Sequence, residues 1–142
     1  MAELSLRQND AKEASRRYQE AFKIWDELVQ IEPNNLSWRA AHAVALAYVG
    51  KTQEARKAAG ELAARCGSAP GLLIQLARCN AICATASADP DAKRQATGQA
   101  LALLRQSANL GWKDARTVQT DPAFTILRDD AAFKTLLNRL RR

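Results

Sequence analysis

Histidine and glycine are scarce in this chain, and each shortage counts against a class of catalytic site. The only histidine, His42, falls among alanines on a helical packing stripe, so we interpret it as a core or groove-lining residue rather than a catalytic base. The six glycines are isolated or follow predicted helices, so the chain has no glycine-rich phosphate-binding loop. We therefore predict no catalytic residues, no enzymatic activity and no small-molecule substrate.

Cysteine is also rare. The three cysteines, Cys66, Cys79 and Cys83, are odd in number and lack the spacing of a disulfide framework. Cys79 and Cys83 would lie one turn apart on a helix, and the further ligands that a zinc site needs are absent. Small buried thiols are the favoured interpretation and metal ligation the weaker one, so we predict no metal and no cofactor.

Long hydrophobic runs are missing as well. No apolar segment approaches the roughly 20 residues that cross a bilayer. No charged-then-apolar leader precedes a small-residue cleavage site. We therefore expect a cytoplasmic protein that makes no membrane contact.

The apolar residues that are present suit helices better than sheets. Hydrophobic residues make up 47% of the 142 residues, many of them alanine, but only 6% are aromatic. Alanine has the highest helix propensity, and no run alternates β-branched or aromatic residues with polar ones. The sequence predicts an all-α fold without strands, in a single domain over residues 1–142.

Helical periodicity and stop signals predict seven or eight helices, and short connections make successive helices antiparallel. Residues 1–9 are expected to be flexible or part of a helix, and Gly50 and Gly111 to end two helices in the left-handed conformation. The predicted ranges are about 10–31, 36–49, 52–66, 69–85, 90–110, 113–119, 122–127 and 130–141. The predicted N-caps are Asp10, Asn34 or Asn35, Thr52, Ser68, Asp89, Asp114, Asp121 and Asp129.

The apolar pattern of the first two thirds of the chain repeats with a period of about 34 residues. Ala21-x3-Trp25 followed by Pro33 recurs as Ala55-x3-Ala59 followed by Gly67. Two helices per unit at this period resemble the tetratricopeptide repeat, in which stacked helix pairs form a superhelix. The units over 10–85 are degenerate, because Ala59, His42 and Gly67 replace the usual aromatic residue, glycine and proline. An insertion of about ten residues, around 86–96, displaces the second helix of the third unit.

The last part of the chain, 97–142, has a different pattern, with one long helix followed by short ones. It contains Gly111-Trp112-x-Asp114, Thr120-Asp121-Pro122-x-Phe124 and Phe133-x2-Leu136-Leu137. This pattern resembles the closing segment of tetratricopeptide regions in bacterial multidomain regulators, especially planctomycete-type serine/threonine protein kinases. The resemblance implies that this part caps the helical stack and that the chain is the C-terminal scaffold or regulatory part of a larger signalling protein.

The motifs of a kinase domain are not in this chain, which has no glycine-rich loop, no His-Arg-Asp loop and no Asp-Phe-Gly. The first repeat is represented mainly by its second helix. We therefore expect a fragment whose preceding domain is missing.

The net charge of +6 is unevenly distributed. Residues 1–32 carry five basic and seven acidic groups, residues 33–113 ten and four, and residues 114–142 six and four. The basic middle indicates an acidic peptide or a nucleic acid as partner, or simply solvated helix faces. Nucleic acid is the weaker hypothesis, because the aromatic residues that would stack on bases lie on predicted core stripes. These residues are Trp25, Trp38, Phe124 and Phe133.

The resemblance implies a concave groove lined by the first helix of each pair, here 36–49 and 69–85. The candidate peptide-binding residues on these helices are Arg39, Tyr48, Ile74 and Arg78. The hypothesis is that the two arginines pair with carboxylates of an acidic peptide while the tyrosine and the isoleucine make apolar contacts. Ordinary surface and packing roles are the alternative for all four.

Self-association is a second hypothesis for the function. The first long helix would expose Ala14, Tyr18 and Trp25 if no preceding helix covered them. A homodimer through this N-terminal helix would bury that stripe.

Overall fold

The computed structural model describes residues 2–65 and 67–141, with side chains described from residue 12 onward. These residues form seven α-helices and one 3₁₀ helix, and none of them lies in a strand. The elements are α1 (Ala2–Ile31), α2 (Leu36–Tyr48), α3 (Thr52–Arg65), α4 (Pro70–Ala86), α5 (Pro90–Asn109), α6 (Ala115–Thr120), η1 (Pro122–Leu127) and α7 (Ala131–Leu140). The all-α prediction is confirmed for this part of the chain. None of these helices is long and apolar enough to cross a membrane.

Several helix ends lie where the sequence predicts them. The side chain of Asn35 caps α2 by accepting from a first-turn N–H at 3.1 Å. Asp89 caps α5 by accepting from the N–H of Asp91 at 3.2 Å. Gly50 and Gly111 follow α2 and α5 with φ angles of +88° and +105°, a region that glycine enters without a steric penalty. Sequence signals of this kind depend on a few neighbouring residues, which is why they predict the ends well.

Other helix starts differ from the prediction. α1 begins at Ala2, so Asp10 lies inside the helix instead of capping it. Thr52 is the first residue of α3 rather than its cap. The cap of α7 is Asp130 and not Asp129, because the Asp130 carboxylate accepts from two N–H groups of the first turn.

The start of α4 also needs correction. α4 begins at Pro70, whose fixed φ suits the first helical position, so Ala69 precedes the helix and Ser68 is one residue too early to cap it. The region predicted as an insertion, around 86–96, contains a short connection and then the start of α5 at Pro90, where the sequence predicts it.

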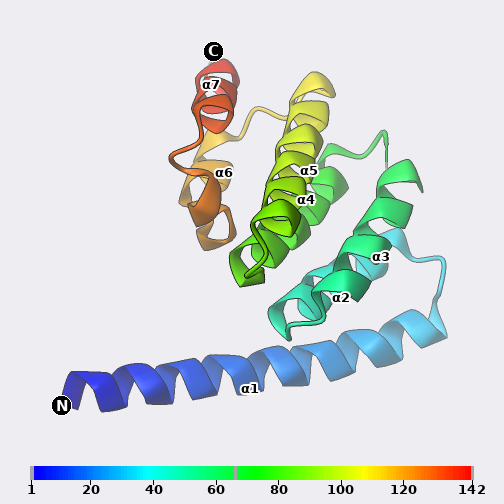
Figure 1. Cartoon of the computed structure of the whole chain (residues 1–142). Helices are drawn as coiled ribbons and strands as arrows, with labels where there is room; N and C mark the ends of the chain where they lie inside the picture. Colours follow the sequence, from blue (N-terminus) through cyan, green and yellow to red (C-terminus); the bar gives the residue numbers. More distant parts are fainter. Residues whose placement is uncertain (1, 66, 142) are drawn as a thin grey trace.

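The helices are stacked in pairs, with α4 at the centre. Figure 1 shows α2 with α3 and α4 with α5 as two antiparallel pairs that lie side by side. α4 contacts both helices of the preceding pair, its own partner α5, and η1. α1 packs against α2 at one end of the stack, and α6, η1 and α7 lie against the second pair (Figure 1).

Small side chains allow α2 and α4 to approach closely. Ala40, Ala43 and Ala47 of α2 are at most 2% exposed and belong to the same core as Leu73 and Leu76 of α4. Because an alanine side chain ends at Cβ, the larger residues of α4 can pack into the space between the two helices.

Of the four aromatic residues predicted for the core, two are buried and two are only half-buried. Phe124 and Phe133 are buried, with ring centroids 6.5 Å apart. Trp25 and Trp38 are only half-buried, so the core position predicted for them is wrong. Trp25 lies on α1, which packs mainly against α2 and therefore has little of its surface covered.

The cysteines of α4 are buried thiols, as the sequence predicts. Cys79 is 0% exposed and Cys83 is 1% exposed. The prediction for Cys66 lies outside the described residues.

Replacing Phe124 by alanine should lower the free energy of unfolding by about 3–5 kcal/mol, because it leaves a cavity in the core. Urea unfolding followed by circular dichroism measures this change. The control Ile24→Ala removes a side chain that is 57% exposed, and it should have an effect below about 0.5 kcal/mol. Equal effects of the two substitutions would contradict the packing.

Candidate binding groove

Four elements meet around a mainly apolar groove of about 340 Å³, which we call the tyrosine groove. It lies between the C-terminal ends of α2 and α4, and α1 and η1 complete its walls. The residues that line it are Tyr18, Ala47, Tyr48, Gly50, Ile82, Thr85, Ala86, Pro122 and Ala123.

One wall of the tyrosine groove is a pair of stacked aromatic rings. The ring centroids of Tyr18 and Tyr48 are 4.2 Å apart and the ring planes differ by 8°. Stacking of this kind contributes about 0.5–1.5 kcal/mol beyond the area that it buries. Tyr18 nevertheless remains 38% exposed, so the stack joins α1 to α2 while keeping aromatic surface in contact with solvent.

The phenol of Tyr48 is held in its neutral form. Burial raises the pKa of Tyr48, and the nearby guanidinium of Arg78 only partly opposes the rise. A neutral phenol both donates and accepts hydrogen bonds. The groove wall therefore offers a polar group beside its apolar surface.

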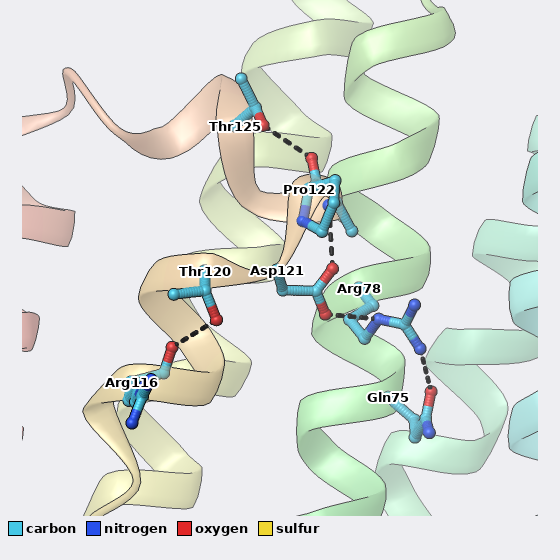
Figure 2. Close-up of polar contacts among 8 residues, drawn as sticks. Gln75, Arg78, Arg116, Thr120, Asp121, Pro122 and Thr125 are labelled. Atoms are coloured by element: carbon cyan, nitrogen blue, oxygen red, sulfur yellow. Dashed lines mark hydrogen bonds and ion pairs between the residues drawn. The ribbon is translucent and has the colours of Figure 1, made fainter.

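An ion pair joins α4 to η1 next to the groove. Nε of Arg78 lies 2.8 Å from Oδ2 of Asp121, and Nη1 of Arg78 donates to the side-chain oxygen of Gln75 at 3.0 Å (Figure 2). The side chains of Arg78 and Asp121 are 27% and 14% exposed. A pair this well covered is screened less by solvent than a surface pair.

Asp121 also caps η1. Its Oδ1 accepts from the N–H of Ala123 at 2.9 Å, while its Oδ2 pairs with Arg78 (Figure 2). The carboxylate thus both starts η1 and fixes it against α4. This double contact positions Pro122 and Ala123 as one wall of the tyrosine groove.

The structure does not bring the four predicted peptide-binding residues into one site. Tyr48 lines the tyrosine groove, and Arg78 lies beside it but is already paired with Asp121. Ile74 is 6% exposed and belongs to the core, so it has almost no surface to offer a partner. Arg39 is nine residues before Tyr48, a rotation of about 900°, which places the two on opposite sides of α2.

Arg39 lines a different hollow, of about 510 Å³, between α1, α2 and α3. His42 lines it too, stacked on Phe22 with ring centroids 5.6 Å apart and with Nε2 3.3 Å from a carboxylate oxygen of Asp26. The Nζ of Lys51 lies 4.9 Å from the centroid of the same Phe22 ring. His42 therefore occupies the packing and groove-lining position that the sequence predicts.

Sequence reasoning missed several residues of the tyrosine groove. Ile82 and Thr85 were not distinguished from other residues of α4, although they lie one and two turns after Arg78 on neighbouring stripes. Pro122 and Asp121 reach α4 only because η1 folds back across more than 40 residues of chain, and no local pattern reports such a contact.

Comparison of the chain with protein-family models, with curated proteins and with solved structures found no match. Its function must therefore be inferred from its own residues and their geometry.

Replacing Asp121 by asparagine should lower the free energy of unfolding by about 1–3 kcal/mol, because Arg78 loses its counter-charge while the asparagine can still cap η1. Chemical unfolding measures the change. Asp91→Asn is the matched control, since the Arg94–Asp91 pair is 80% exposed on both sides and should contribute less than about 1 kcal/mol. An Asp121→Asn protein as stable as the parent chain would exclude a structural role for the ion pair.

The Tyr48 phenol should ionise above the ordinary tyrosine pKa of about 10. Because folding raises the pKa of Tyr48, the phenol stabilises the folded state fully at pH values below its pKa in the unfolded chain. This stabilisation is lost as the pH rises through the pKa of Tyr48 in the folded protein. Phenolate absorbance followed against pH measures this, and Tyr48→Phe should remove a component that titrates above the ordinary tyrosine pKa. If the component that Tyr48→Phe removes titrates at or below the ordinary tyrosine pKa, the burial of this phenol would be contradicted.

Proposed function

We propose that the chain is a non-catalytic protein-interaction module of the tetratricopeptide kind, and that the tyrosine groove holds a peptide segment of its partner. The packing of the two helix pairs supports the repeat architecture. The first helix of the second pair contacts both helices of the first pair, which is the neighbour-to-neighbour contact on which a solenoid depends. The contacts of η1 with α4 and of α7 with α5 suit a segment that caps the last pair.

The observation that carries the proposal is the partly exposed stack of Tyr18 on Tyr48, which forms one wall of a groove lined mainly by apolar residues. Tyr18 and Tyr48 stand over a groove whose other lining residues include Ile82, Ala86 and Pro122. Aromatic residues in partly desolvated grooves dominate the energetics of many protein interfaces. A peptide with one apolar anchor residue, hydrogen-bonded by the neutral Tyr48 phenol, fits this surface.

Neither of the two arginines predicted to bind an acidic partner is available in the tyrosine groove. Arg78 is neutralised within the chain by Asp121, and Arg39 lies in the other hollow. A preference for acidic peptides therefore depends on the net charge of +6, which acts at long range and is weakened by salt. The role as the C-terminal scaffold or regulatory part of a larger signalling protein is proposed on the resemblance alone.

Self-association through α1 is the alternative. The stripe expected to form a dimer is partly used within the chain, because Tyr18 stacks on Tyr48 and both Ala14 and Trp25 are half-buried. Ile24 and Ile31, which are 57% and 72% exposed, lie seven residues apart on another face of α1. Among residues 12–31, whose side chains the structure describes, these two and the stacked Tyr18 are the exposed large apolar residues of α1, and the use of Tyr18 within the chain favours peptide binding.

A peptide-display library selected on the intact chain tests the proposal. Selected peptides should share an apolar anchor, and Tyr18→Ala or Thr85→Glu should weaken their binding about tenfold or more. Thr135→Glu is the matched control, because Thr135 is exposed on α7 and makes the same hydroxyl bond to a carbonyl four residues back. Peptides that bind all three variants equally would place binding outside the groove.

Sedimentation of the same chain over a wide concentration range addresses the alternative. A monomer throughout supports the peptide-binding role. A dimer that is lost in Ile24→Asp would instead favour self-association through α1.

A further inference from the structure

A separate hollow of about 550 Å³ lies where α3, α4 and the start of α5 meet, and we call it the thiol pocket. Its size is within the range of small-molecule sites. It is lined by Thr52, Gln53, Arg56, Cys83, Ala86, Ser87, Ala88, Asp89, Ala92 and Ala96. The proposed peptide-binding function makes no use of it.

The two thiols of α4 differ in their access to this pocket. The Cys79 thiol points into the core, where it makes weak contacts with the carbonyl oxygens of Ala43 and Ala55 at 3.4 and 3.6 Å. The Cys83 thiol contacts the carbonyl oxygen of Thr52 at 3.7 Å, and both Cys83 and Thr52 line the pocket. Cys83 is therefore the thiol nearer to the pocket, although only 1% of its surface is exposed.

The pocket also carries one charge of each sign. Arg56 of α3 donates from Nη2 to the side-chain oxygen of Gln99 at 3.1 Å, and among the described residues its buried Nε has no hydrogen-bond partner. Asp89, in the connection before α5, uses one carboxylate oxygen to accept from the N–H of Asp91. A zwitterionic molecule would find a cation for its carboxylate and an anion for its ammonium group.

The surroundings distinguish the two cysteines electrostatically. A hydrogen bond from the Cys79 thiol lowers the pKa of Cys83, burial opposes this, and the Arg56 charge lowers it again. The same hydrogen bond, together with burial, raises the pKa of Cys79. The thiolate is the reactive form in disulfide exchange, and Cys83 is also the thiol that lines the pocket, so Cys83 is the nucleophile of the pair.

We propose that Cys83 is a site of thiol–disulfide exchange with a small zwitterionic disulfide of the size of oxidised glutathione. The Cys83 thiolate attacks one sulfur of the disulfide, a new S–S bond forms, and the bond between the two original sulfurs breaks. The departing thiolate takes up the proton that Cys83 lost. Arg56 and Asp89 hold the attached half by its carboxylate and ammonium groups.

The test uses the full chain with Cys66→Ser in every sample, so that only Cys79 and Cys83 carry thiols. The folded protein is incubated with oxidised glutathione and analysed by intact mass and peptide mapping. We expect one glutathione per chain on Cys83, retained in Cys79→Ser and absent in Cys83→Ser. Mapping on the chain with both cysteines identifies the site even where Cys83→Ser destabilises the fold.

Arg56→Gln tests the recognition of the carboxylate. It should slow the reaction with oxidised glutathione about fivefold more than the reaction with cystamine, a cationic disulfide without carboxylates. Equal slowing of both reactions would overturn the assignment of a carboxylate-bearing ligand.

Two results would overturn the exchange site itself. One is the absence of any adduct on the folded chain. The other is equal modification of Cys79 and Cys83, the pattern expected when thiols react only after the helices separate. Incubation in urea, where both cysteines are exposed, provides that reference pattern.

Discussion

The fold depends on the burial of α4. Ten of its 17 residues are buried, and the helix contacts α2, α3, α5 and η1. A helix that is apolar around most of its circumference is stable only when neighbours cover it from every side. Its buried Asn80 is only half satisfied, since the side-chain N–H group donates to the carbonyl oxygen of Leu76 at 3.0 Å while Oδ1 has no hydrogen-bond partner among the described residues. The C-terminal segment must therefore fold back, and η1 supplies the last cover.

Both proposed sites follow from this constraint. The last two turns of α4 present Ile82 and Thr85 to the tyrosine groove and Cys83 to the thiol pocket, and Ala86 lines both. The return of η1 closes the groove, because the Arg78–Asp121 pair fixes it on α4. A single buried helix thus positions an aromatic peptide-binding surface on one side and a thiol on the other.

The sequence predicts those features that depend on neighbouring residues. The helices, the left-handed ends at Gly50 and Gly111, and the buried thiols of α4 are read from local pattern and composition. The site is predicted only at Tyr48 and, beside it, Arg78. Arg39 is also predicted for this site, but it lies nine residues before Tyr48 and therefore on the opposite side of α2. Ile74 is predicted to lie on the groove surface, but neighbouring helices bury it. The remaining wall depends on contacts between distant segments, for which one sequence gives no local signal.

Native-state hydrogen exchange of the α4 amides tests the central claim most directly. If the burial of α4 holds the structure together, amides in the middle of α4 should exchange only through global unfolding and be the slowest of the chain, while those in the first half of α1 exchange through local opening. Exchange of the α4 amides as fast as those of α1 would contradict the account, because the helix that positions both sites would then open by itself.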